Sequence, residues 1–187
     1  MTSLLNKKQV VPQIPDFLLN DGPEMKGVPV EINVTFPGDM QMLAMIPSIR
    51  TLSFQRPITK LSMPNNVCER RTLENMLYGI LPQGRLLEYI DLSGNPLSER
   101  FLINFAQNAY DLKHLETFRM ANVNVPAAVW PKLMVGLGVN GALECLDVSN
   151  TDLGAYSQQS ISDVCRLIED TPITTLHMCH NTFRKEG

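Results

Sequence analysis

Leu87-Glu88-Tyr89-Ile90-Asp91-Leu92-Ser93-Gly94-Asn95 follows the pattern L-x-x-L-x-L-x-x-N, and this stretch decides the fold. The pattern recurs, with other aliphatic residues at the leucine positions, in four more segments, which begin at Ile58, Leu115, Leu143 and Ile173. The five segments therefore begin 29, 28, 28 and 30 residues apart. A fixed period of this size predicts a solenoid, in which each unit buries its apolar face against the next.

One amphipathic helical pattern lies in each of the four intervals between these segments, with apolar residues at i, i+3, i+4 and i+7. We expect the following side chains to point inward: Leu73, Met76, Leu77 and Ile80; Leu102, Phe105, Ala106 and Ala109; Trp130, Leu133, Met134 and Leu137; Ile161, Val164, Cys165 and Ile168. Because a helical crossover joins each strand to the next, the strands must run parallel. The sequence thus predicts an α/β repeat array with a sheet on one side and helices on the other.

The N-terminal part of the chain departs from this period. Residues 1–27 are rich in proline and polar residues, so we expect a loosely ordered lead-in. Residues 28–57 carry an alternating strand pattern, a short helical piece at 39–45 and a stretch at 49–54 that looks like another strand motif. We interpret 28–57 as an irregular N-terminal cap or first repeat, followed by leucine-rich units over 58–187.

The C-terminal part holds the fifth motif without a helical pattern after it. Residues 58–187 therefore contain four full units and a terminal strand. Such a strand leaves an open edge and part of an apolar face. We expect further chain or another subunit to cover this edge.

Composition and charge exclude several classes of function. The net charge is -3, so nonspecific nucleic-acid binding is not expected. The four cysteines lie far apart without a C-x-x-C pair, which argues against a zinc framework or a disulfide scaffold. No apolar run suits a signal peptide or a membrane span, so we expect a cytoplasmic protein that does not insert into membranes. Gly136-x-Gly138-x-x-Gly141 ends a helical pattern instead of following a strand, so we expect no nucleotide or other cofactor.

The motifs resemble leucine-rich repeats of the ribonuclease-inhibitor type over residues 58–187, with good matches at Leu87–Leu97 and Leu143–Ser149. This resemblance implies a horseshoe-shaped solenoid with parallel strands on the concave face and helices on the convex face. The stretch Leu143–Phe183 resembles the repeats of the CARMIL family, regulators of actin capping protein, which implies a role in cytoskeletal regulation. RanGAP-like proteins share the repeat, and they imply a GTPase-activating protein as an alternative. Their catalytic arginine has no position that we can assign on this chain.

The strand positions not used for the core form the candidate binding face. One column comprises Lys60, Tyr89, Thr117, Cys145 and Thr175, and a second comprises Ser62, Asp91, Arg119, Asp147 and His177. A third row at the margin contains Glu88, Glu116 and Glu144. We expect this face to bind a basic or mixed-charge protein partner, with Tyr89 and Arg119 as anchors because such residue types often dominate interfaces. The alternative is a solvated face on which Arg119 forms a surface ion network worth ~1 kcal/mol or less.

A catalytic site is the sharper alternative on the same face. Asp147, His177 and Cys179 would lie on two neighbouring strands, and a thiolate nucleophile needs a base within hydrogen-bond reach. Residues i and i+2 on a strand are ~6.6 Å apart with parallel side chains, so these groups do not converge. A metal ion would also require a fourth ligand. We therefore expect a non-enzymatic, metal-free interaction scaffold; a structural repeat segment of a larger assembly is a further alternative.

Overall fold

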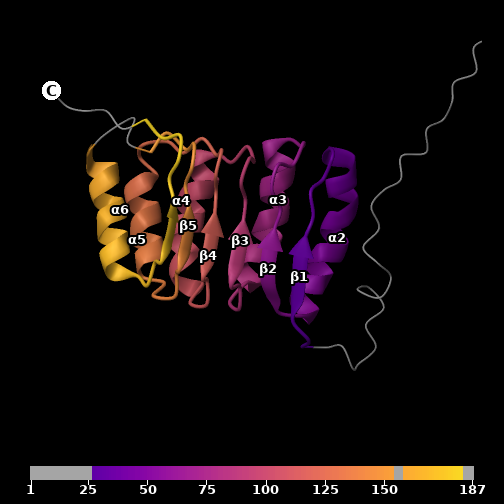
Figure 1. Cartoon of the computed structure of the whole chain (residues 1–187). Helices are drawn as coiled ribbons and strands as arrows, with labels where there is room; N and C mark the ends of the chain where they lie inside the picture. Colours follow the sequence, from indigo (N-terminus) through magenta and orange to yellow (C-terminus); the bar gives the residue numbers. More distant parts are fainter. Residues whose placement is uncertain (1–26, 154–157, 183–187) are drawn as a thin grey trace, which may run out of the picture.

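The computed structural model describes residues 27–153 and 158–182, which form a parallel sheet in the order β1-β2-β3-β4-β5-β6 covered by helices on one side (Figure 1). The strands are β1 (Val30–Asn33), β2 (Ile58–Ser62), β3 (Tyr89–Asp91), β4 (Thr117–Arg119), β5 (Cys145–Asp147) and β6 (Thr175–His177). The helices are α2 (Asp39–Gln55), α3 (Arg70–Ile80), α4 (Glu99–Asn108), α5 (Trp130–Gly138) and α6 (Gln158–Asp170), with 3₁₀ turns η2 (Leu81–Gln83) and η3 (Ala109–Asp111). Neighbouring strands are also neighbours in the sequence, which is the order expected of a solenoid. The predicted α/β repeat fold is confirmed.

The core runs along the array between the sheet and the helices. The central strand residues Leu61, Ile90, Phe118 and Leu146 are at most 1% exposed. The inward positions predicted for the first three helical intervals are all buried. Since burying one large aliphatic side chain contributes about 1.5–3 kcal/mol, the stacked units stabilise one another through this shared core.

An asparagine ladder closes the strand ends, as the motif predicts. The Asn95 side-chain amide donates to the carbonyl oxygens of Met63 at 2.7 Å and Leu92 at 2.8 Å, while its oxygen accepts from the backbone N–H of Asn66 at 3.1 Å. Two motifs lack this asparagine. Thr151 donates its hydroxyl to the Val148 carbonyl at 2.6 Å, whereas Val123 is fully buried and joins the core.

Residues 28–57 form a strand and a helix, like the units that follow. β1 pairs in parallel with β2, and α2 extends to Gln55, ten residues beyond the helical piece expected from the sequence. The stretch 49–54, which looks like a strand motif in the sequence, is therefore helical. Ile49 and Leu52 are buried at helical spacing from Met42 and Met45, whereas Phe54 is 72% exposed. The lead-in predicted for residues 1–27 lies outside the described residues except for Gly27.

The terminal unit differs from the others in its helix. Val164 and Leu167 of α6 are buried, but Cys165 and Ile168 are exposed, so the inward face predicted for this helix is shifted. Leu167 lies six residues before Ile173, as the buried Leu137 lies six residues before Leu143, which explains the shift. β6 pairs only with β5 among the described strands, and Leu176 is therefore only partly buried.

Among the helices of the described ranges, none combines the length and the apolar character that a membrane crossing requires.

Candidate functional site

The sheet face opposite the helices presents the two predicted columns in register. The pairs Lys60–Tyr89, Tyr89–Thr117, Thr117–Cys145 and Cys145–Thr175 form one column, and Ser62–Asp91, Asp91–Arg119, Arg119–Asp147 and Asp147–His177 form the other. In β3, β4 and β5 the central residue is buried and both flanking residues are half-buried. Thr175 and His177 are exposed, whereas Ser62 is only 8% exposed and presents little surface. The register thus brings nine of the ten predicted residues together on one accessible face.

Tyr89 lies at the centre of a cationic platform on this face. The Lys60 Nζ atom lies 5.0 Å from the centroid of the Tyr89 ring, and the Arg119 Cζ atom lies 5.8 Å from the same centroid. Lys60 also pairs with Glu31 of β1 at 3.7 Å. Each cation–π contact contributes about 0.5–1 kcal/mol at such exposed sites. The three side chains therefore hold one another in place before any partner binds.

The ion network proposed for Arg119 does not form. Arg119 lies in register between Asp91 and Asp147, yet it makes no ion pair with either residue in the described part of the chain. Each carboxylate instead accepts from a backbone N–H at the strand end, that of Ser93 at 2.9 Å and that of Ser149 at 3.0 Å. Within the described residues, the guanidinium of Arg119 is therefore held by the Tyr89 ring and is not paired with either aspartate.

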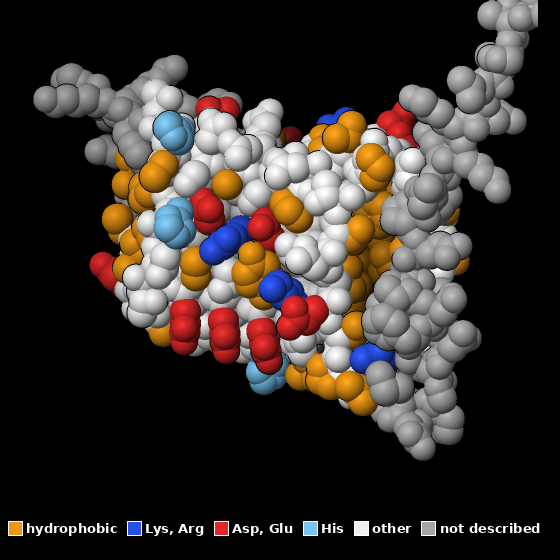
Figure 2. Space-filling view, turned by 45° about the vertical axis from the view of Figure 1, so that its right-hand side comes forward, with side chains coloured by type: hydrophobic (Ala, Val, Ile, Leu, Met, Phe, Trp, Pro, Cys, Tyr) orange, Lys and Arg blue, Asp and Glu red, His pale blue; other side chains and the backbone are white. Residues whose placement is uncertain are grey.

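An acidic row borders the platform. The Glu116 N–H donates to the Glu88 carbonyl at 2.9 Å, and the Glu144 N–H donates to the Glu116 carbonyl at 2.8 Å. All three side chains are exposed, and Figure 2 shows acidic side chains in a row along one margin of this face. Like charges on neighbouring strands repel one another. The row therefore gives this margin of the face a negative charge.

The Tyr89 hydroxyl keeps its proton at neutral pH. Burial raises the pKa of Tyr89 above its usual value of 10.0, and the Asp91 carboxylate raises this pKa further, while Arg119 lowers it. A protonated phenol is a neutral hydrogen-bond donor with a flat apolar body. Tyr89 is thus suited to bind a partner by contact area and hydrogen bonding, without contributing charge.

The candidate catalytic group does not assemble into a reactive site. His177 is in register with Asp147, but the Asp147 carboxylate is engaged by Ser149, and no hydrogen bond joins His177 to Cys179 in the described residues. Within the same ranges, no three His, Cys, Asp or Glu side chains lie close enough to hold a metal ion. The arrangement is suited to recognition, and the absence of catalysis stays a prediction.

Comparison with known proteins agrees with this geometry. A family model described as Leucine Rich Repeat matches residues 86–108, which comprise β3 and α4. Among solved structures, the chain is similar to the C-terminal domain of tropomodulin from Caenorhabditis elegans, with a TM-score of 0.57 and 11% identity, covering 73% of this chain and 81% of that chain. The chain has a leucine-rich-repeat fold.

Two further comparisons were made. An internalin, InlF, from Listeria monocytogenes is similar with a TM-score of 0.44 and 16% identity, covering 73% of this chain and 32% of that chain. No curated protein matches the chain.

One contributor to this face was not predicted from the sequence. Glu31 of β1 is in register with Lys60 and pairs with it, so β1 extends the candidate face by one strand. The alternation of Val28 to Phe36 signals this strand, and the parity of residue 31 places its side chain outward. The irregular interpretation of 28–57 kept Glu31 out of the predicted site.

Proposed function

We propose that the protein is an interaction module that binds a basic or mixed-charge protein segment on the concave face of its sheet. Lys60, Tyr89 and Arg119 are the central contacts, and the acidic row of Glu88, Glu116 and Glu144 attracts the cationic part of the partner.

The state of Arg119 is the observation that carries this proposal. Its guanidinium contacts the Tyr89 ring and forms no ion pair within the described residues, although Asp91 and Asp147 flank it in register. Arginine and tyrosine are among the residue types that most often dominate interfaces, and this charge stays available for an acceptor of a partner. Because the platform is already ordered, binding loses less side-chain entropy.

Regulation of the actin cytoskeleton is the context we propose. It is supported by the resemblance of residues 143–183 to CARMIL repeats and by the fold shared with a tropomodulin domain. Among the described strands β6 is an edge strand with Leu176 only partly buried, which also supports a role as one segment of a larger assembly in which another subunit covers Leu176.

A net-charge-neutral exchange tests the concave face. Arg119→Glu combined with Asp147→Lys inverts the local charge pattern and leaves the overall charge unchanged. We expect proteins captured from cell lysate by the wild-type chain, and quantified by mass spectrometry, to fall about tenfold or more with this variant, as for loss of an interface hot spot. The circular-dichroism spectrum should not change.

The matched control places the same kind of exchange on the helical side. Lys132→Glu combined with Asp170→Lys alters exposed residues of α5 and α6 and should leave capture intact. If capture survives the concave exchange, or falls equally with the control, then the concave face is not the binding site.

A further inference from the structure

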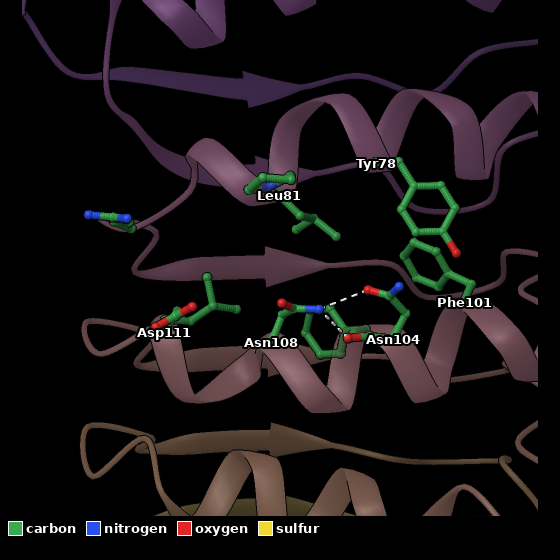
Figure 3. Close-up of a pocket in the computed structure, with 10 residues that line it drawn as sticks. Tyr78, Leu81, Phe101, Asn104, Asn108 and Asp111 are labelled. Atoms are coloured by element: carbon green, nitrogen blue, oxygen red, sulfur yellow. Dashed lines mark hydrogen bonds between the residues drawn. The ribbon is translucent and has the colours of Figure 1, made fainter.

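The helical layer has a cleft between α3 and α4. Helices α2 and α3, α4 and α5, and α5 and α6 pack side by side, whereas α3 and α4 leave a cleft of about 460 Å³ between them (Figure 3). Glycine residues allow two of these pairs of helices to approach closely. A Cβ added at Gly136 of α5 would overlap the backbone carbonyl of Ala106 in α4, and one added at Gly79 of α3 would overlap the Arg50 side chain from α2.

Aromatic rings hold α3 and α4 apart. Tyr78 of α3 meets Phe101 of α4 edge-on, with ring centroids 5.4 Å apart, as Figure 3 shows. Phe101 stacks near Phe105 at 6.5 Å, and Phe105 stacks on Phe118 of the sheet at 5.0 Å. This chain of rings reaches from the cleft into the core, so the floor of the cleft is rigid and apolar. Tyr78 remains 39% exposed at its side.

Polar groups mark the rim of the same cleft. The Asn108 amide donates to both the backbone and the side-chain oxygen of Asn104, which fixes one lip of the cleft on α4. Arg85 and Asp111 lie at the end that η2 and η3 form, and neither makes an ion pair within the described ranges. The cleft thus combines an apolar floor with free polar groups at its margin, as ligand sites generally do.

A cluster of arginines extends the groove beyond Asn104. Asn104 also lines a shallower groove with Arg70, Arg71 and Arg100, at the end where α3 and α4 begin. These three arginines are exposed and form no ion pairs in the part of the chain that the structure describes. Two glutamates, Glu74 and Glu99, line the groove as well, but Glu74 accepts from the Ser98 N–H at 2.7 Å. A positive end of this kind stands out on a chain whose net charge is -3.

We propose that the α3–α4 cleft is a second protein-binding site, which takes an acidic amphipathic segment of a partner. One large apolar side chain of the segment enters between Tyr78 and Leu81, and its carboxylates lie beside Arg70, Arg71 and Arg100. The eleven residues of α3 extend about 16 Å, so a helical segment of about ten residues spans the groove. The apolar cleft and the arginine cluster lie at different ends of the groove, and this length favours a peptide over a compact small molecule.

This site is independent of the concave face. The groove lies among the helices, on the side of the molecule opposite the platform around Tyr89, so the two sites can be occupied together. A substitution that abolishes binding at one site should therefore leave binding at the other site unaffected.

A displayed library of random twelve-residue peptides tests the proposal on the full chain. We expect the enriched peptides to combine an aromatic residue or leucine with two or more acidic residues on one helical face. Asn104→Trp fills the cleft from an exposed position and should weaken their binding about tenfold or more. Arg70→Glu with Arg71→Glu should weaken it about fivefold or more, and more strongly at low salt.

Matched variants control for the general effects of an added tryptophan and of a change in net charge. Gln55→Trp adds the same ring at the exposed end of α2, and Lys132→Glu with Arg166→Glu makes the same change in net charge on α5 and α6. Both controls, and the concave exchange at Arg119 and Asp147, should retain binding within about twofold. The proposal is overturned if enriched peptides are neutral or basic, if Asn104→Trp binds them normally, or if reversal of the arginines has no effect. It is also overturned if vesicles of phosphatidylserine and phosphatidylcholine bind through the arginines while no peptide does.

Discussion

The pKa of the Cys68 thiol depends on the position of this residue between two elements of the fold. It lies between β2 and α3, partly buried against the core, and near Asp39 at the start of α2. Burial raises the pKa of the Cys68 thiol to about 11, and the negative charge of Asp39 contributes to this rise. The Asp39 carboxylate also accepts from the Glu69 N–H at 2.8 Å, so its position is fixed.

This shift predicts slow alkylation of Cys68. Since the pKa rises from 9.0 to about 11, its thiolate fraction at pH 8 should be about a hundredfold below that of an ordinary cysteine. In native protein treated with iodoacetamide, mass spectrometry should find Cys68 labelled more slowly than the exposed Cys165 and Cys179. Raising the pH from 8 to 10 should accelerate labelling of Cys68, and unfolding should abolish the difference. Equal rates in the folded state would contradict the assigned environment.

The asparagine ladder shows where sequence reasoning about single residues succeeds. The hydrogen bonds of Asn66 and Asn95 could be predicted because the motif fixes both the strand end and the side-chain type. The burial of Val123 required the structure, since a single sequence does not say whether a substituted position rejoins the core or opens to solvent. Likewise, the register predicted that Arg119 lies between two aspartates. It did not predict that these aspartates accept hydrogen bonds from the backbone N–H groups of Ser93 and Ser149.

At the scale of elements, α5 carries two glycines that differ only in their surroundings. Gly136 faces α4, where an added Cβ would overlap the Ala106 carbonyl, whereas at Gly138 the nearest atom is Leu167 Cδ1 at 3.6 Å. We expect Gly136→Ala to destabilise the fold by about 1–3 kcal/mol, because the two helices must separate. Gly138→Ala should be neutral or stabilise by about 0.5–1 kcal/mol through helix propensity.

Urea unfolding followed by circular dichroism measures both variants under identical conditions. An equal effect of the two substitutions would show that α4 and α5 are not in close contact at Gly136.

The helices also show which features of an element the sequence predicts. The spacing of Leu73 to Ile80 gave the inward face of α3, because four large apolar residues leave no alternative face. In α6, Val164 is buried as predicted, but Leu167 is buried in place of Cys165 and Ile168, which are exposed. The α3–α4 cleft was not predictable, because it depends on the relative size of side chains on different helices and not on any periodic pattern.

At the scale of the whole molecule, the two faces of the solenoid have different origins. The concave face follows from strict register, so its residues could be predicted from their spacing before their contacts were known. The convex face depends on how helices of unequal bulk pack, and its cleft arises where the aromatic residues of α4 meet α3. A repeat array can therefore vary its convex surface without disturbing the sheet.

Stability should depend on position along the array, and one substitution made at two places tests this. Leu146 is fully buried in β5 between two strands, whereas Leu176 is partly buried in β6 at the edge of the sheet. A carboxylate at position 146 is buried among apolar side chains, so Leu146→Asp should cost about 4 kcal/mol or more and unfold the array. Leu176→Asp should cost only about 1–2 kcal/mol and loosen the last unit, since interactions in a solenoid are largely between neighbours.

Thermal denaturation and amide hydrogen exchange distinguish these outcomes. Leu176→Asp should lose protection in β6 and α6 while β2 to β4 stay protected, and Leu146→Asp should lose protection throughout. A folded Leu146→Asp protein would contradict the strand register. Equal unfolding by both substitutions would mean that the array behaves as a single cooperative unit, in which the terminal strand is as essential as an interior one.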